Sequence, residues 1–321
     1  MIRQESPMEI GISRHAPKPQ QEVGAVQDNM SQGIDKEQVA ETIGPTVDEF
    51  ITRLEQARAG SIMALEPSNV GRAEQTRGLL AEKLAEKLQE RDDIKVVSLG
   101  TNEHEAELVL KEILANPGKK FILADVRGTW LLGSKEDEPM IAAANKWDKR
   151  LGDEHLRGAL WASHKEELPK LLEKLHEAGI DITLEELQPG DFKHTPEEAA
   201  MRQIKWMLAM QKIAHKYFPD RPILLEGISH HIRSDFASLA LLGEDISLEA
   251  VERVLGSKFR EPFARSSVSF AEDGSVKVND RGISKEYTPE EFKELLVDIR
   301  ERDNIRKKEW GLTTEGNEDE R

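Results

Sequence analysis

Two histidines in this chain each follow directly on a short apolar segment. Arg14 and His15 come after the apolar run 8–13, and His230 comes after the run 222–229. If both runs are parallel strands of one sheet, their carboxyl ends meet at the edge where open α/β sheets bind ligands. A histidine there can act as a nucleophile or a base, and a neighbouring guanidinium can bind an anion through paired hydrogen bonds. The pair Arg14-His15 therefore predicts a phosphate site.

Arg72 and an acidic residue complete the candidate set. Arg72 follows the apolar run 61–65 and lies at the beginning of a predicted helix, where free amides and the helix dipole favour an anion. Asp125 follows the apolar run 121–124. Two histidines and two arginines around one anion suit phosphoryl transfer through a covalent phosphohistidine. The arginines would neutralise the phosphate oxygens while one imidazole attacks phosphorus in line.

The elements that must position these residues follow from the apolar spacing. Strands that alternate with helices predict a parallel sheet with helices on both faces. Thr46 is expected to cap the first helix, and Asp273-Gly274 is expected to join an antiparallel hairpin at the edge of the sheet. The predicted strands are 8–13, 61–65, 94–99, 121–124 and 222–229, with the hairpin at 266–270 and 275–278. The predicted helices are 47–57, 71–90, 103–114, 232–242 and 289–308.

The predicted fold class is α/β: a three-layer α/β/α arrangement with a mostly parallel sheet and a C-terminal β-hairpin. A single α/β domain is expected over 8–312. Within it, the charged and helical stretch 129–218 is expected to be an insertion that forms a lid over the carboxyl-terminal edge of the sheet. Residues 313–321 are expected to be a disordered acidic tail. Four histidines lack the spacing of metal ligands and are expected at the surface: His155, His164, His176 and His194.

Composition limits the possible partners and chemistry. The chain has 321 residues, a net charge of -16 and no cysteine. The acidic balance disfavours nucleic acid, and the absence of cysteine excludes thiol catalysis, disulfides and thiolate zinc sites. Neither a membrane-spanning run nor a signal-peptide pattern is present in the sequence, so we expect a cytoplasmic protein without a membrane partner. The expected partner is a small phosphorylated substrate; the oligomeric state stays open.

The chain resembles the histidine phosphatase superfamily, which has the phosphoglycerate-mutase-like fold. The family's Arg-His-Gly signature is similar to Ser13-Arg14-His15-Ala16. Its Ser-Pro-x-x-Arg-Ala-x-x-Thr segment is similar to Pro67-Ser68-Asn69-Val70-Gly71-Arg72-Ala73-Glu74-Gln75-Thr76. Its late strand that ends in His-Gly is similar to Ile228-Ser229-His230-His231. These three matches occur in the order of the family and span residues 8–243 apart from the insertion.

The resemblance implies a role for each candidate residue. His15 would be the nucleophile that is phosphorylated on a ring nitrogen, Arg14 and Arg72 would bind the phosphate, and His230 would donate a hydrogen bond to it. A carboxylic acid would protonate the leaving oxygen and later activate water, and Asp125, shortly before Gly128 and Gly133, is the first candidate. No metal or cofactor is implied. Alternative candidates for the acid are Glu103, Glu105, Glu136 and Glu138.

Two residues depart from the family pattern. Ala16 replaces a glycine, and its methyl would narrow the pocket if the backbone must approach the phosphate there. His231 replaces another glycine, and it stands where the acid-phosphatase branch has its acid, which argues against that branch. The resemblance implies a metal-independent phosphatase that hydrolyses a phosphomonoester. The alternatives are a catalytically weak or inactive phosphate-binding or regulatory protein of the same fold, and a phosphomutase.

Overall fold

The chain divides into two compact units, each made of three segments. The computed structural model describes residues 8–14, 36–68, 71–99, 103–124, 146–147, 150–151, 154–229, 231–255 and 265–312. The first unit, which holds the sheet, contains Met1–Lys135, Lys205–His231 and Glu261–Thr288. The second unit, whose described elements are helices, contains Glu136–Ile204, Ile232–Arg260 and Pro289–Arg321. The predicted single domain over 8–312, its insertion at 129–218 and the position of that insertion stay predictions, and 313–321 lies outside the described residues.

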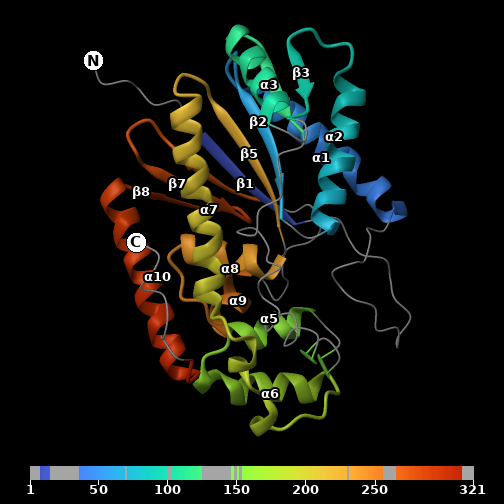
Figure 1. The fold of residues 1–321 in the computed structure, drawn as a ribbon. Coiled ribbons are helices and arrows are strands. Elements are labelled where there is room, and N and C mark those ends of the chain that lie inside the picture. The colour runs from blue at the N-terminus through green and yellow to red at the C-terminus, as the bar shows by residue number, and fades with distance from the viewer. Residues whose placement is uncertain are drawn as a thin grey trace. The chain divides into compact units, whose positions relative to one another are not determined.

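The first unit contains an eight-stranded sheet in the order β3-β4-β2-β5-β1-β6-β7-β8 (Figure 1). The pairs from β3 to β1 are parallel, and those from β1 to β8 are antiparallel. This mixed sheet confirms the α/β prediction. The strands are β1 (Met8–Arg14), β2 (Ile62–Pro67), β3 (Ile94–Val97), β4 (Lys120–Leu123), β5 (Ile223–Ser229), β6 (Arg265–Phe270), β7 (Val276–Asp280) and β8 (Ile283–Tyr287).

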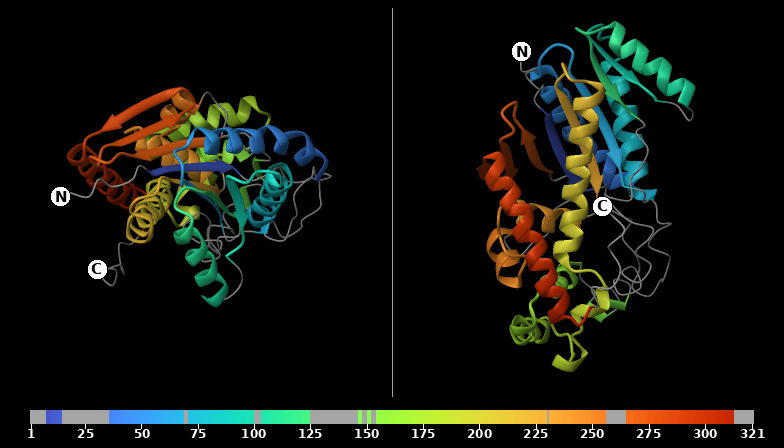
Figure 2. Two further views of the ribbon diagram at one scale, coloured as in Figure 1. Left: turned by 90° about the horizontal axis from the view of Figure 1, so that it is seen from above. Right: turned by 60° about the vertical axis from the view of Figure 1, so that its left-hand side comes forward.

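Helices cover both faces of this sheet (Figures 1 and 2). α1 (Lys36–Gln56) and α2 (Gly71–Leu88) pack on one face, where Phe50 and Leu84 share a buried apolar cluster with Leu224 of β5. α3 (Glu103–Ala115) and the part of α7 (Pro196–Tyr217) from residue 205 lie on the other face. The first unit is therefore a three-layer α/β/α structure, as predicted.

The helix α1 begins earlier than the sequence predicts. Thr46 lies inside the helix, which starts at Lys36, so the prediction that Thr46 is its cap is wrong. Gly44 and Pro45 resemble a helix boundary, because proline disfavours the helical conformation of the residue before it. The apolar stripe nevertheless continues to Ile43, which is buried in the core. Burial of this earlier turn outweighs the cost of an internal proline.

A third antiparallel strand extends the predicted hairpin. β6 and β7 pair around the turn that contains Gly274, which confirms the hairpin. β8 then pairs with β7 through Asp280 and Ile283. The two residues between them, Arg281 (φ 49) and Gly282 (φ 80), both have positive φ, as a tight hairpin turn requires. The sequence prediction missed β8 because an arginine is uncommon in this turn conformation.

A group of two carboxylates and two arginines, with one carboxylate fully buried, ties α1 to the sheet. In this β5 charge cluster, Glu226 binds both Arg53 and Arg265, with 3.0 Å between Glu226 Oε2 and Arg265 Nε. Arg53 and Arg265 also bind Glu9 Oε1, at 2.8 and 2.7 Å. The side chain of Glu226 is 0% exposed. Burial acts to raise the pKa of Glu226, but the two guanidinium groups outweigh it and lower that pKa.

The second unit is held together by aromatic packing and by buried charges. Trp161 stacks on Phe192 and contacts Phe236 edge-on, with 5.2 Å between ring centroids in each pair. Arg306 is fully buried and donates a hydrogen bond of 2.8 Å to Glu197 Oε1. The helices that the structure bounds in this unit are α5 (Glu154–Ala162), α6 (Leu168–Glu177), the first part of α7, α8 (His231–Leu241) from residue 232, α9 (Leu248–Leu255) and α10 (Pro289–Glu309).

His164 corrects the expectation that the histidines of this region are solvated at the surface. Its ring nitrogens lie 3.2 Å from Glu309 Oε2 and 3.0 Å from Asp245 Oδ2, and its side chain is only 23% exposed. The hydrogen bond with Asp245 raises the pKa of His164, and burial and Arg306 partly oppose that rise. The histidine therefore joins the loop before α9 to the end of α10.

None of the helices in the described part of the chain combines the length and the apolar character that crossing a bilayer requires.

The glycine at position 11 is required for the β5 charge cluster. A Cβ at Gly11 would lie 2.2 Å from Arg265 Nε and 2.3 Å from Glu226 Oε2. We expect Gly11→Ala to lower the free energy of unfolding by about 2 kcal/mol, because the added methyl overpacks a buried ion pair. Gly78→Ala is the control: nothing lies within 4 Å of its Cβ, and helix propensity should make that variant more stable by about 0.5 kcal/mol. Urea unfolding followed by circular dichroism measures both, and equal midpoints would contradict the expectation.

Glu226 also predicts a pH dependence of stability. Because the folded-state pKa is lowered, the stability from Glu226 is complete above its ordinary pKa of 4.5 and is lost as the pH falls below that value. Glu226→Gln removes the buried carboxylate that binds Arg53 and Arg265 and leaves these arginines with the more exposed Glu9, so it should cost about 3 kcal/mol at neutral pH. The difference between the variant and the wild type should shrink in acid. A difference that is constant with pH would contradict this assignment.

Candidate active site

Three neighbouring strands of the first unit end together at one edge of the sheet. Arg14, the last residue of β1, pairs in register with Ser229, the last residue of β5. On the other side of β5, Pro67 of β2 pairs with Ile228, and the Ser68 amide donates a hydrogen bond of 2.7 Å to the Ile228 carbonyl. We call this the carboxyl-end edge. It is the edge at which the sequence places the candidate residues.

The structure describes some of the candidate residues and not others. Arg14 ends β1 and is half-buried, and Arg72 is the second residue of α2, although its side chain is outside the described part. His15, His230 and Asp125 lie outside the described residues, but each follows a described strand or its extension. The arrangement of the strands is therefore established, and the roles of these five residues stay predictions. Among the alternative acids, Glu105 is exposed on α3, and the side chains of Glu103, Glu136 and Glu138 are not described.

The Arg-Ala-x-x-Thr segment forms the beginning of α2. Ala73 and Thr76 are both buried, at 0% and 1% exposure, because residues three apart lie on the same face of a helix. Arg77 follows them and donates a hydrogen bond of 2.9 Å to the backbone carbonyl of Ala124. The Ala124 amide in turn donates to the Val97 carbonyl at 3.0 Å. Arg77 therefore fixes the chain at the end of β4, directly before Asp125.

Glu66 is a candidate that the sequence reasoning did not identify. It is the penultimate residue of β2, is only 4% exposed, and its Oε2 makes no hydrogen bond among the described residues. Burial raises the pKa of Glu66 to about 7. The indole of Trp206 offsets part of this rise. The sequence signal that could have identified Glu66 is an acidic residue near the end of an otherwise apolar strand.

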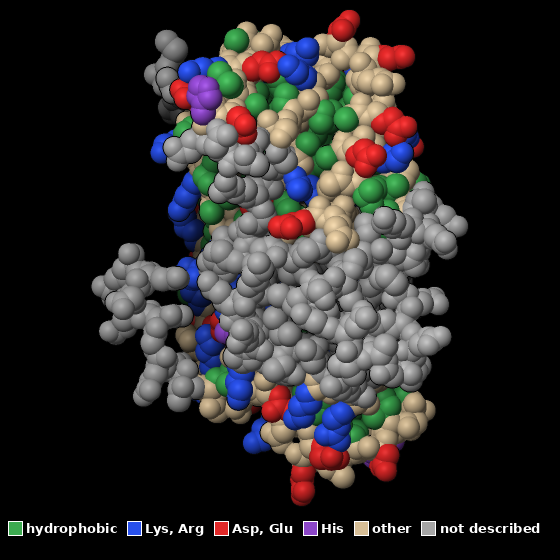
Figure 3. Space-filling view, turned by 45° about the vertical axis from the view of Figure 1, so that its right-hand side comes forward, with side chains coloured by type: hydrophobic (Ala, Val, Ile, Leu, Met, Phe, Trp, Pro, Cys, Tyr) green, Lys and Arg blue, Asp and Glu red, His purple; other side chains and the backbone are tan. Residues whose placement is uncertain are grey.

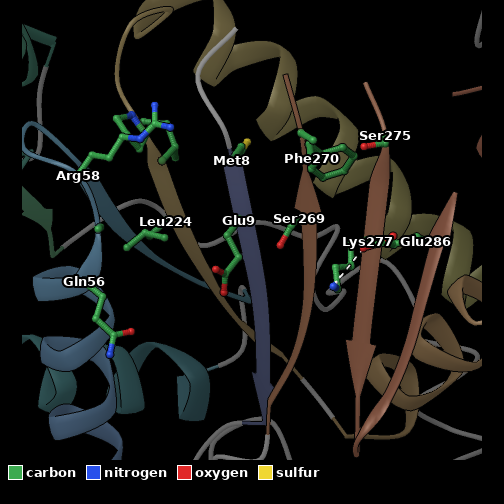
Figure 4. A pocket seen from close by; sticks show the side chains of 14 residues that line it. Met8, Glu9, Gln56, Arg58, Leu224, Ser269, Phe270, Ser275, Lys277 and Glu286 are labelled. Atoms are coloured by element: carbon green, nitrogen blue, oxygen red, sulfur yellow. Dashed lines mark ion pairs between the residues drawn. The ribbon is translucent and has the colours of Figure 1, made fainter. Parts of the chain in front are cut away.

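A pocket of about 460 Å³ lies where β1 and β5 begin, at the ends of these strands opposite the carboxyl-end edge (Figure 4). Met8 and Leu224, at the beginnings of β1 and β5, line it together with Phe270 at the end of β6. The ion pair between Lys277 and Glu286, at 3.1 Å, stands at its rim. Because Arg14 is at the other end of β1, this pocket is separate from the carboxyl-end edge.

The described surface carries charges of both signs. On the face shown in Figure 3, acidic and basic side chains of the described residues are interspersed. Within the described ranges, no group of three or more His, Cys, Asp or Glu side chains is placed to hold a metal ion. A net charge of -16 disfavours anions at long range, so a phosphate would need local cationic groups such as Arg14 and Arg72.

The chain is similar to solved structures at low sequence identity. No family model and no curated protein matches the chain. A solved mycobacterial glucosyl-3-phosphoglycerate phosphatase is 12% identical, covers 82% of this chain and 90% of its own, and has a TM-score of 0.35. A solved structure described as mycobacterial hydrolase 2 is 11% identical, covers 94% of this chain and 98% of its own, and has a TM-score of 0.39. At these identities and TM-scores, the similarity carries no argument about function.

The raised pKa of Glu66 predicts a second pH dependence of stability. The stability contributed by its protonated form is complete below the ordinary pKa of 4.5 and is lost as the pH rises through about 7. The total loss should be about 3 kcal/mol. Glu66→Gln keeps the neutral shape, so the variant should become more stable than the wild type as the pH rises from about 5 to about 8. Urea unfolding across this range measures the difference, and parallel curves would show that Glu66 does not titrate as expected.

Proposed function

We propose that this protein is a phosphatase that hydrolyses a phosphomonoester through a phosphohistidine at His15. One structural observation supports this most strongly: β1, β5 and β2 are neighbours and end at one edge. These are the strands that lead to Arg14-His15, to His230 and to Arg72. Strands that are far apart in the sequence therefore end at a common edge. The helix that follows β2 begins there, and the N-terminus of a helix favours anions.

The proposed reaction has two steps. In the first, a ring nitrogen of His15 attacks phosphorus as the bond to the ester oxygen breaks, and Asp125 gives its proton to that oxygen. In the second, water attacks the phosphohistidine, the Asp125 carboxylate accepts a proton from the water, and phosphate leaves as the imidazole is restored. Arg14 and Arg72 neutralise the phosphate oxygens, and His230 donates a hydrogen bond to them. Such groups act chiefly by stabilising the charge of the transition state.

The proposal includes independence of a metal ion, because the attacking group is an imidazole and the charge on the phosphate is neutralised by guanidinium groups. The substrate class is a phosphorylated metabolite of small or medium size. A phosphomutase would need a second phosphate site, and the described residues of the carboxyl-end edge give no specific support for one.

His15→Ala should abolish the hydrolysis of a chromogenic phosphate ester, with a loss of about 10³-fold or more in kcat, because no nucleophile remains. The control is His104→Ala, since His104 is exposed on α3 and should be dispensable. A chelator should leave the wild-type rate unchanged. Phosphate from labelled substrate should be retained by the denatured wild type in base, lost in acid, and not retained by His15→Ala.

Activity that survives His15→Ala would overturn the proposed mechanism. Binding of phosphate by the wild type without any turnover would instead favour the phosphate-binding or regulatory protein, in which Ala16 or His231 impairs the chemistry.

A further inference from the structure

Glu66 places a buried carboxyl next to the carboxyl-end edge. It pairs in register with Gly227 of β5, which has no side chain, and it is followed in β2 only by Pro67. The same glycine pairs with Ile12 of β1 on its other side. β5 therefore presents no side chain beside a carboxyl that lies one residue from the end of its strand.

This carboxyl shares a face of the sheet with Arg14. Glu66 is opposite Gly227, whereas Arg14 is opposite Ser229, two residues further along β5. Side chains alternate between the faces of a strand, so residues opposite Gly227 and Ser229 project to the same side. Glu66 and the predicted phosphate ligand Arg14 thus project from the same face of the sheet. Glu66 lies two residues further from the carboxyl-end edge than Arg14, as counted along β5.

Among the described residues, the groups that face Glu66 from neighbouring elements compensate little of its charge. β5 contributes Gly227, and α7 contributes the neutral indole of Trp206, which is fully buried. Beyond β5, Arg14 ends β1 on the same face, and on the β4 side Arg77 binds the backbone carbonyl after that strand. Burial is the largest influence on the pKa of Glu66, and the indole is the other. In Glu226, by contrast, two guanidinium groups outweigh burial and lower the pKa.

We propose that Glu66 is a positioning residue: its neutral form permits the carboxyl-end edge to hold a phosphate dianion, and its ionised form weakens that binding. The inference rests on the proposed function, since it concerns the same site. A neutral acid adds no negative charge near the predicted phosphate ligand Arg14. An ionised acid adds a negative charge in surroundings where coulombic interactions are stronger than in water. The affinity for phosphate should fall as Glu66 loses its proton.

The test compares anion binding by the wild type and by Glu66→Gln at two pH values. Sulfate is the probe, because it stays a dianion throughout the range and does not react. The ratio of the wild-type Kd to the variant Kd should be about 1 at about pH 5.5 and about 10 at about pH 8.5. Any other group that titrates in this range is common to both proteins, so its effect cancels in the ratio. Calorimetry gives the two constants.

The matched control is Glu74→Gln, which removes an exposed carboxylate from the first turn of α2. Its Kd ratio to the wild type should be the same at both pH values, because this side chain is exposed and its charge is screened by solvent. A second variant, Trp206→Phe, removes the indole that lowers the pKa of Glu66. It should move the loss of sulfate affinity to a higher pH, and this result does not depend on the folding of Glu66→Gln.

The outcomes separate the two proposals. A ratio that is equal at both pH values for Glu66→Gln, or an unshifted curve for Trp206→Phe, would overturn the role of Glu66 and leave the proposed function intact. A wild type that neither binds sulfate nor hydrolyses phosphate esters would overturn both.

Discussion

The parallel pairing of β5 with β1 on one side and β2 on the other is the constraint on which the rest of the first unit depends. Every residue of β5 is buried, so the strand can occupy only the middle of the sheet. Its register fixes where the neighbouring strands end, and Arg14 and Pro67 are consequently brought to within two strands of each other. Helices on both faces then follow, since parallel strands need crossover connections.

This central strand also explains why two buried glutamates behave in opposite ways. Glu226 belongs to β5 and faces α1, where Arg53 and Arg265 neutralise it and lower its pKa. Glu66 lies on the neighbouring strand and faces the other helical layer, where burial raises its pKa and, among the described residues, the indole of Trp206 offsets only part of that rise. Both carboxyls have lost water to a similar degree. The number of guanidinium groups within reach decides which form of each is stable.

Much of the fold could be predicted from the sequence, because the apolar runs and the turn residues are local signals. The parallel strands and the hairpin at Gly274 follow from such signals. The early start of α1 was hidden by Pro45, and β8 was hidden by Arg281 in a glycine-like conformation. The charge cluster around Glu226 could not be predicted, since its members are far apart in sequence and meet only in the folded sheet. For the candidate site, local motifs predicted the edge, whereas the buried acid beneath it depends on tertiary packing.

The division of each unit into three segments has a consequence for the order in which the protein can assemble. During synthesis β1 precedes its antiparallel neighbour β6 by some 250 residues of the chain. Until then β1 exposes unpaired amides and carbonyls along one side, the kind of surface that recruits foreign strands. The interval includes most of the helical unit. The pairing of β1 with β5 and β6 is therefore a late event in biosynthesis.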